Sequence, residues 1–501
     1  MRVKTIFCLA IVMFAAWFLI KPLLQPGFFL SDDGEWMIIR LSAFFQSLRD
    51  GQFPVRFIGR LNHGFGYPVA NFLYPGFLYL GSLIHVFRFS FADSVKLILA
   101  GSIFGAGTFV FLWLRVFFSW WASLFGAISF IFAPYLVFDL YTRGSVGEIF
   151  ALLPASAALY ALTSKRVWLL APAIGLLVIG HNSLALLLLS YLVLYALTIG
   201  QAHRWLSFLL GIGGAAFFWI PALVEKQYVQ FDATTISKYA DYFLKSDMLV
   251  LLGPLFLLAA AATLMQKKMQ PSTRLPLVVF IVSGLLATPI SDVVWRVIPM
   301  APLVQFPYRF LAVGMFAGAY LAANLFETRQ RIIQLGIVAV AVMVFSITVL
   351  PRVSSVKTVA REPGFYETNE DSTTVADEYM PRWVKVKPTQ HTLRKIAMVK
   401  GLGTVTLVRY STRRLEANAS SQAGSTIGLS TIYYPGWGVL VDDVPVPIAH
   451  ANERGLIEFD VPAGKHHIVA SFRETPLRLL ADAISVISFI GYLYYEISLV
   501  F

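Results

Sequence analysis

Residues 69–87 read VANFLYPGFLYLGSLIHVF, and whether this stretch crosses a membrane decides the fold of the whole chain. Its length approaches the roughly 20 apolar residues that span a bilayer. Asn71, Pro75, Gly81 and His85 interrupt it, however, and aromatic side chains dominate it, which is typical of interfacial or re-entrant helices. We predict that it lies along the outer face of the membrane without crossing.

The rest of the sequence is that of a polytopic membrane protein. Of its 501 residues, 57% are hydrophobic and 14% are charged, and the mean hydropathy is +0.69. These values exclude a soluble globular protein. The first apolar run, residues 5–24, lacks a signal-peptide cleavage site, so we interpret it as an uncleaved span with a cytoplasmic N-terminus. The twelve predicted spans are 5–24, 97–117, 118–138, 149–164, 167–181, 183–200, 205–223, 248–265, 275–290, 309–326, 332–350 and 477–499.

Basic residues orient these spans. With residues 69–87 outside the membrane core, nine lysines and arginines in the inner loops all fall on one side, which the positive-inside rule identifies as cytoplasmic. A crossing at 69–87 would place all nine outside. The net charge of +12 would by itself suggest a nucleic-acid binder. The position of these basic residues in the inner loops indicates that the charge instead reflects the orientation of the chain in the membrane. The nine residues are Arg115, Lys165, Arg166, Arg204, Lys267, Lys268, Arg274, Arg329 and Arg331.

The outer face receives a long first loop, 25–96, and a large polar segment, 351–476. Alternating β-forming residues in the second of these predict antiparallel strands at 405–410, 438–441, 456–461 and 467–472. The predicted fold is thus an all-α polytopic membrane protein of about 12 transmembrane helices with a C-terminal extracytoplasmic β-sandwich-like domain. Its predicted parts are a transmembrane domain, 1–350, the β-rich domain, 351–476, and a C-terminal transmembrane helix, 477–501.

Soluble-enzyme motifs are missing from the sequence. It contains no phosphate-binding Gly-rich loop, no His-Glu-x-x-His zinc motif and no convincing nucleophile elbow. The single cysteine, Cys8, excludes an internal disulfide and a cysteine-built metal site.

The first outer loop opens with Ser31-Asp32-Asp33-Gly34-Glu35-Trp36, which places three carboxylates at the membrane surface. Proximity and partial burial raise carboxylate pKa values, so Asp33, Asp32 or Glu35 is a candidate general base or cation ligand. The alternative is that an aspartate caps the following helix and that the helix dipole stabilises the negative charge of Glu35 in the first turn. One carboxylate can do both.

Further polar residues are expected on the same face. Arg56, Arg60 and Tyr67 follow in the first loop, and Arg143, Glu148, His181 and Arg309 lie at outer ends of distant spans. Span-end charges commonly only snorkel to the interface, and a lone histidine is commonly structural. Because all of these residues are expected on the outer face of the membrane, we nevertheless favour a binding site. Guanidinium groups beside a carboxylate-bearing loop are suited to bind a phosphate.

These residues and their surroundings resemble the membrane glycosyltransferases of the GT-C class, and in particular a bacterial family of YfhO-like membrane proteins. The resemblance covers nearly the whole chain. The stretches that carry it are 33–41, Asp50-Gly51-Gln52-Phe53-Pro54-Val55-Arg56, Gly64-Phe65-Gly66-Tyr67-Pro68, Asn71-Phe72, Arg143-Gly144-Ser145 with Glu148, Gln305-Phe306-Pro307-Tyr308-Arg309-Phe310 and Tyr434-Pro435-Gly436-Trp437.

The resemblance implies transfer of a sugar from a polyprenyl-phosphate-linked donor to a cell-envelope acceptor, on the outer face of a bacterial cytoplasmic membrane. It implies Asp33 or Asp32 as base or metal ligand. Where the family often carries a histidine one turn later, this chain has Met37, which favours a metal-independent base over a divalent cation.

The sequence leaves two other classes of function open. A transporter or flippase of an envelope lipid or glycan would show ionisable residues near the midplane and discontinuous helices in two related halves. A non-catalytic scaffold would have first-loop carboxylates that face away from any cavity.

Overall fold

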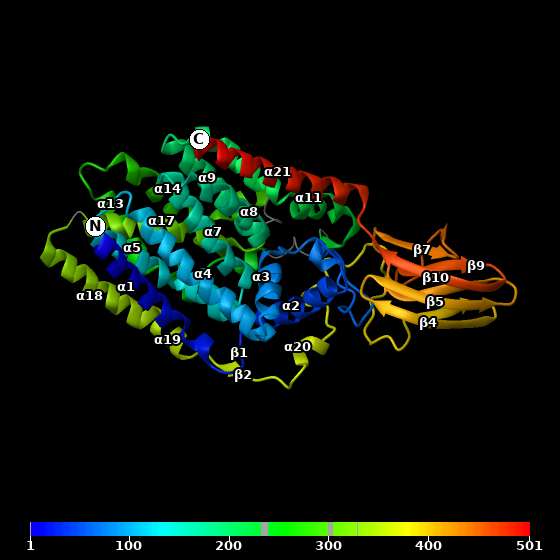
Figure 1. Cartoon of the computed structure of the whole chain (residues 1–501). Coiled ribbons are helices and arrows are strands. Elements are labelled where there is room, and N and C mark those ends of the chain that lie inside the picture. The colour runs from blue at the N-terminus through cyan, green and yellow to red at the C-terminus, as the bar shows by residue number, and fades with distance from the viewer. Residues whose placement is uncertain (1, 232–238, 299–303, 328, 501) are drawn as a thin grey trace.

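The computed structural model describes residues 2–231, 239–298, 304–327 and 329–500. Residues 1, 232–238, 299–303, 328 and 501 lie outside them, which includes parts of the loops expected between the spans 205–223 and 248–265 and between 275–290 and 309–326. The molecule is elongated: a large helical part carries a β-rich part at one end, and α21 returns from the β-rich part along the helical part (Figure 1). The principal helices are α1 (Arg2–Ile20), α2 (Gly34–Arg49), α3 (Gly76–Val86), α4 (Phe91–Leu114), α5 (Trp120–Ile131), α6 (Pro134–Val137), α7 (Val146–Thr163), α8 (Leu170–Gly180), α9 (Asn182–Thr198), α10 (Trp205–Gly214), α11 (Ala216–Val224), α13 (Pro254–Leu264), α14 (Pro271–Leu286), α15 (Asp292–Val297), α17 (Phe310–Glu327), α18 (Arg331–Thr348), α19 (Leu350–Ser354), α20 (Phe365–Thr368) and α21 (Pro476–Val500).

Within the described residues, seven helices are long and apolar enough to cross a membrane, or up to ten if each of three bent helix pairs counts as one span. Each of these coincides with a predicted span, and the two predicted spans that remain fall on the shorter apolar stretches Val167–Gly180 and Asn182–Thr198. The chain is a multi-pass membrane protein, while the count of twelve stays a prediction. At 1.5 Å per residue, the 11-residue α3 is about 16 Å long, roughly half the hydrocarbon core.

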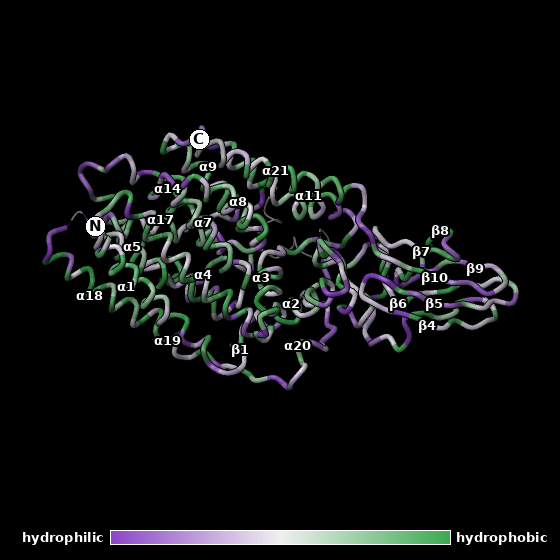
Figure 2. The backbone as a smooth tube through the Cα atoms, viewed as in Figure 1, coloured by the Kyte–Doolittle hydropathy of each residue, from purple (hydrophilic) through white to green (hydrophobic). Residues whose placement is uncertain are grey.

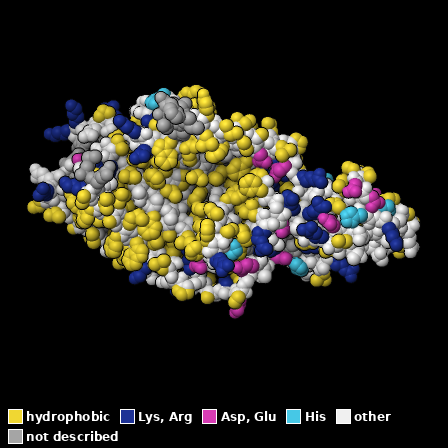
Figure 3. Space-filling view, viewed as in Figure 1, with side chains coloured by type: hydrophobic (Ala, Val, Ile, Leu, Met, Phe, Trp, Pro, Cys, Tyr) yellow, Lys and Arg dark blue, Asp and Glu magenta, His cyan; other side chains and the backbone are white. Residues whose placement is uncertain are grey.

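Burial separates central helices from peripheral ones. In α7 and α17, 83% and 89% of the most apolar window is buried, whereas only 11% of that window is buried in α18 and in α21, which are at least as apolar. Helices that are apolar all round belong inside a protein or against lipid. Figure 2 accordingly shows hydrophobic residues along much of the helical part. Figure 3 shows hydrophobic side chains over the surface of this part, with Lys and Arg at the end farthest from the β-rich part.

The segment 351–476 contains two antiparallel sheets. One has the order β4 (Gly403–Ser411), β5 (Arg414–Ser421), β10 (Gly464–Phe472), β7 (Trp437–Val441) and β8 (Val444–Val446); the other has β3 (Ile396–Lys400), β6 (Ser425–Ile432) and β9 (Leu456–Val461). The four predicted strands lie in β4, β7, β9 and β10, so these predictions are confirmed. Alternate residues of β5, β6 and β9 are buried, as the period-2 pattern requires. The sandwich packing stays a prediction.

The first outer loop is joined to the start of this segment. β1 (Phe28–Phe29) pairs with β2 (Thr358–Val359). The stretch that follows, residues 360–380, lies against α2 and the first loop, and we call it the strap. The Tyr67 hydroxyl lies 3.0 Å from Thr374 Oγ1 and accepts the backbone N–H of Tyr379 at 3.1 Å.

Candidate active site

A widened helical turn brings the first loop to the membrane-embedded part. The span Trp120–Arg143 ends in a π-turn over Phe138–Arg143, a geometry frequent at functional sites. Gly144 follows with φ 65°, and a Cβ there would lie 2.3 Å from Ser31 Oγ. Glycine thus permits the close approach, and the backbone N–H groups of Asp32 and Asp33 donate to the carbonyls of Thr142 and Arg143 at 2.9 and 2.8 Å.

Beside this turn lies a buried group of charged side chains that we call the Glu148 cluster: Asp139, Arg143, Glu148, His181 and Arg309. Glu148, which is fully buried, accepts hydrogen bonds from Arg143 Nη1 at 2.5 Å and Arg309 Nε at 2.8 Å. Arg143 Nη1 also donates to Asp139 at 2.7 Å. Three stretches distant in sequence supply these groups, namely 139–148, His181 and Arg309, and a buried carboxylate shared by two guanidinium groups holds them together.

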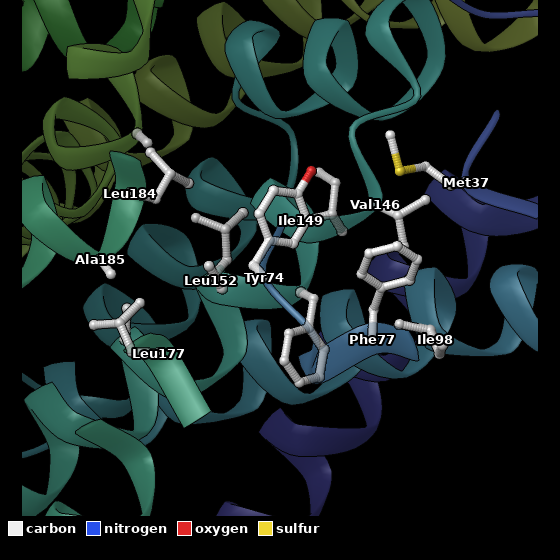
Figure 4. Close-up of a cluster of buried hydrophobic side chains, with 14 of the residues drawn as sticks. Met37, Tyr74, Phe77, Ile98, Val146, Ile149, Leu152, Leu177, Leu184 and Ala185 are labelled. Atoms are coloured by element: carbon white, nitrogen blue, oxygen red, sulfur yellow. The ribbon is translucent and has the colours of Figure 1, made fainter. Parts of the chain in front are cut away.

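His181 joins the cluster through its ring. It precedes α9, and its Nδ1 accepts the backbone N–H of Leu184 at 3.2 Å. The proton of the neutral imidazole therefore belongs on Nε2, which lies 3.7 Å from Glu148 Oε1. The Tyr74 ring packs on the imidazole with 4.5 Å between centroids. Around Tyr74, the side chains of Val146, Ile149 and Leu152 form part of an apolar core (Figure 4).

The three first-loop carboxylates have different surroundings. Asp33 occupies the N-cap position of α2, yet its carboxylate makes no capping hydrogen bond. Burial raises its pKa, against the opposing effect of the Arg143 and Arg40 charges. Asp32 is exposed. Only Asp33 therefore combines partial burial with the neighbourhood of the Glu148 cluster.

Glu35 is already paired. Its carboxylate accepts hydrogen bonds from Arg361 Nε at 2.7 Å, from Arg361 Nη2 at 2.6 Å and from the Tyr366 hydroxyl at 3.0 Å. The Arg361 guanidinium lowers the pKa of Glu35. The contact ties the start of α2 to the strap, and a strongly ionised, paired carboxylate is a poor proton acceptor.

Three predicted binding residues lie elsewhere. Arg56 bonds to Glu474 at 3.3 Å and to Asp482 at 2.9 Å. Arg60 donates to the Tyr366 carbonyl at 3.2 Å and to Ser42, and Tyr67 binds the strap as described above. The described contacts of these three residues are structural, and a role in substrate binding stays a prediction.

The structure adds residues that the sequence did not single out. Arg40 is 3% exposed, and its charge acts on Asp33 two turns earlier in α2; this i, i+7 spacing was the available signal. Asp139 stands four residues before Arg143, which is the spacing of a helical ion pair. Tyr135 donates to Glu148 Oε2 at 3.2 Å, which no spacing indicated.

A second buried charged group fastens α21 to the outer part. Arg478 Nε and Nη2 donate to the two carboxylate oxygens of Glu225 at 2.9 and 2.8 Å. Asn71 and the Tyr434 hydroxyl also donate to Glu225, each at 2.8 Å. First loop, α11, β-rich part and α21 meet at this one carboxylate. Among the described residues, no group of three or more His, Cys, Asp and Glu side chains is placed to hold a metal ion.

Comparison with known proteins gives distant structural likeness. No family model and no curated protein matches the sequence. A structure of the arabinofuranosyltransferase AftD from Mycobacteria is similar at 14% identity and a TM-score of 0.45, over 70% of this chain and 27% of that one. The oligosaccharyltransferase of Archaeoglobus fulgidus in its apo form is similar at 13% identity and a TM-score of 0.46, over 71% of this chain and 57% of that one.

The archaeal oligosaccharyltransferase AglB, in complex with an inhibitory peptide and a dolichol-phosphate, matches at 15% identity with a TM-score of 0.27. The chain thus spans just over half of one neighbour and about a quarter of another. All these TM-scores lie below 0.5, so the proposals that follow rest on the geometry of the site. The resemblance to YfhO-like proteins stays a prediction from the sequence motifs.

Proposed function

We propose that this protein is a membrane glycosyltransferase that moves a sugar from a polyprenyl-phosphate-linked donor to a cell-envelope acceptor on the outer face of a bacterial cytoplasmic membrane. The observation that carries the proposal is the setting of Asp33. Its half-buried carboxylate has a raised pKa, makes no capping hydrogen bond and stands where the first loop meets Arg143. A carboxylate so placed suits a general base.

In the proposed reaction, Asp33 accepts the proton of an acceptor hydroxyl while that oxygen bonds to the anomeric carbon. The bond between the anomeric carbon and the phosphate oxygen breaks, and the electron pair leaves with the lipid phosphate. Arg143 bonds to both carboxylates of the cluster through Nη1, and Arg309 bonds to Glu148 through Nε. Arg309 Nη1 also donates to the Val304 carbonyl at 2.8 Å and to Gln305 Oε1 at 3.0 Å. The proposed donors to the departing phosphate are therefore Nη2 of Arg309 and the Nε and Nη2 groups of Arg143.

A groove beside the cluster suits the isoprenoid tail of the donor. It has a volume of about 380 Å³ and is lined mainly by apolar side chains of α8, α9, α10 and α11, among them Leu186, Leu189 and Trp219. Asn182 and Lys226 stand among these residues, at the ends of α9 and α11 that are predicted to face outward. A lysine at that level complements a phosphate, and Asn182 is the sequence neighbour of His181.

Genetic complementation tests the proposal. In a strain that lacks the gene, wild-type protein restores an envelope sugar that mass spectrometry detects, and D33N does not, although it inserts and folds normally. D32N is the matched control, because it makes the same change at the exposed neighbour and is expected to restore the sugar. Full restoration by D33N would overturn the assignment.

One observation favours transport as a second candidate function. Helix pairs at 202–228, 246–264 and 271–297 are bent by 66°, 64° and 86°, and discontinuous helices are frequent in transporters. The charged groups of the Glu148 cluster nevertheless lie at predicted outer ends of spans, as sugar transfer at the membrane surface requires. Movement of a labelled glycolipid across proteoliposomes, retained in D33N, would favour transport.

A further inference from the structure

A polar cavity lies where the β-rich part meets the first loop and α21. It measures about 380 Å³ and is bounded by Gln52, Phe53, Arg413, Arg414, Ser471, Phe472, Arg473 and Glu474. The arginines come from the turn between β4 and β5 and from the end of β10, which antiparallel pairing between β5 and β10 brings together. Figure 3 shows Lys and Arg side chains gathered over the same junction.

The cavity carries excess positive charge. Arg413 donates to the neutral carbonyl of Gly51, so its charge is not cancelled by that bond. Arg473 is exposed and makes no ion pair with any side chain that the structure describes. Arg414 pairs with Glu416 at 2.7 Å, and Glu474 is paired with Arg56 at 3.3 Å. Two guanidinium groups therefore remain for an anion that enters the cavity.

The position of the cavity is at the membrane surface. Glu474 stands two residues before Pro476, where the apolar helix α21 begins. Phe53 is 77% exposed, and its ring lies 5.8 Å from that of Tyr79 in the short apolar helix α3. Exposed aromatic side chains beside cations are typical of the level of the lipid headgroups.

We propose that this cavity binds the phosphodiester headgroup of an anionic lipid in the outer leaflet. Guanidinium groups bind phosphate oxygens through paired, charge-assisted hydrogen bonds, and the Ser471 hydroxyl is a further donor at the cavity wall. The occupied site joins the base of the β-rich part to the bilayer. It is separate from the Glu148 cluster and does not depend on sugar transfer.

Lipid retention by the full-length protein tests this proposal. The protein is purified in detergent with equal amounts of phosphatidylglycerol and phosphatidylcholine, and native mass spectrometry measures the ratio of the two bound lipids. Wild type is expected to retain phosphatidylglycerol selectively. R473Q lowers the ratio about fivefold and R413Q/R473Q about 25-fold, because each basic group at a membrane surface contributes about a fivefold factor. R409Q/R454Q removes two exposed arginines elsewhere in the β-rich part and leaves the ratio unchanged.

Three results would overturn the proposal. R473Q, whose side chain anchors no described contact and should fold, could retain phosphatidylglycerol as wild type does. The control pair could reduce the ratio as much as R413Q/R473Q does, which would indicate a general charge effect. Soluble glycerol phosphate could displace the lipid at equal concentration, which would show that the site recognises free phosphate and not a membrane lipid.

Discussion

Replacement of Glu148 by glutamine tests whether the Glu148 cluster takes part in sugar transfer or, like the buried Glu225–Arg478 pair, only stabilises the fold. The change preserves the shape of the side chain but removes the negative charge that Arg143 and Arg309 share. Hydrogen bonds to charged groups contribute about 1.5–3 kcal/mol each, and breaking a buried ion pair costs about 3–5 kcal/mol. Arg143 keeps Asp139 as a partner, so we expect a loss near the lower end, about 3 kcal/mol of unfolding free energy.

E225Q is the matched control. Glu225 is 2% exposed and binds the Arg478 guanidinium through both oxygens, so its replacement is expected to cost a similar free energy. Detergent-induced unfolding of the purified proteins measures both losses. Sugar transfer distinguishes the two sites: E148Q lowers it about 100-fold, because the arginines lose their fixed position beside the departing phosphate, whereas E225Q affects transfer much less.

Two outcomes for E148Q would contradict these expectations. If E148Q unfolds as easily as expected but transfers sugar at the wild-type rate, the Glu148 cluster holds the spans together and takes no part in the reaction. If E148Q is as stable as wild type, the carboxylate does not carry the charge balance of the two arginines.

Two further predictions concern pH and the donor lipid. An ordinary aspartate has a pKa of about 3.9. Because burial raises the pKa of Asp33, this base loses its proton at a higher pH, and the acid limb of the pH profile of kcat/KM for transfer lies above that reference value. Arg40→Gln removes a charge that lowers this pKa, and the limb moves to higher pH; a limb that stays in place or moves to lower pH contradicts the role of Asp33. Leu189→Trp fills the groove beside α9, and we expect it to raise KM for a lipid-linked donor about tenfold without changing kcat. The control is Leu194→Trp, on an exposed part of the same helix, which leaves KM unchanged. Equal KM values for the two variants in kinetic assays would show that the tail lies elsewhere.

Much of the fold followed from local patterns. Long apolar runs predicted the helices that can cross a membrane, because a buried or lipid-facing helix must be apolar along its whole length. Alternating residues predicted β4, β7, β9 and β10, because successive side chains of a strand point to opposite faces. β3, β5, β6 and β8 were not among the predicted strands. In β5, the serine- and alanine-rich sequence RLEANASS lacks large β-forming side chains.

The candidate site was predictable only in part. Arg143, Glu148, His181 and Arg309 were named because they stand at the expected outer ends of spans, whereas Asp139 and Tyr135 were not named. Among the first-loop carboxylates, residue chemistry left Asp33, Asp32 and Glu35 open, and the resemblance favoured Asp33 or Asp32. The strap separated them, since Arg361 and Tyr366 pair with Glu35 from more than 320 positions away. Arg56, Arg60 and Tyr67 share the same loop as Asp33, yet their partners come from α21 and the strap.

The sequence by itself determined which segments are apolar enough to leave water and which face collects the basic residues, because both depend on composition along the chain. Only the tertiary structure decided that Glu148 is shared by Arg143 and Arg309, and that residues 69–87 contribute an 11-residue helix. Side-chain pairing across distant elements depends on helix packing and on a π-turn of six residues, Phe138–Arg143, which no local pattern encodes.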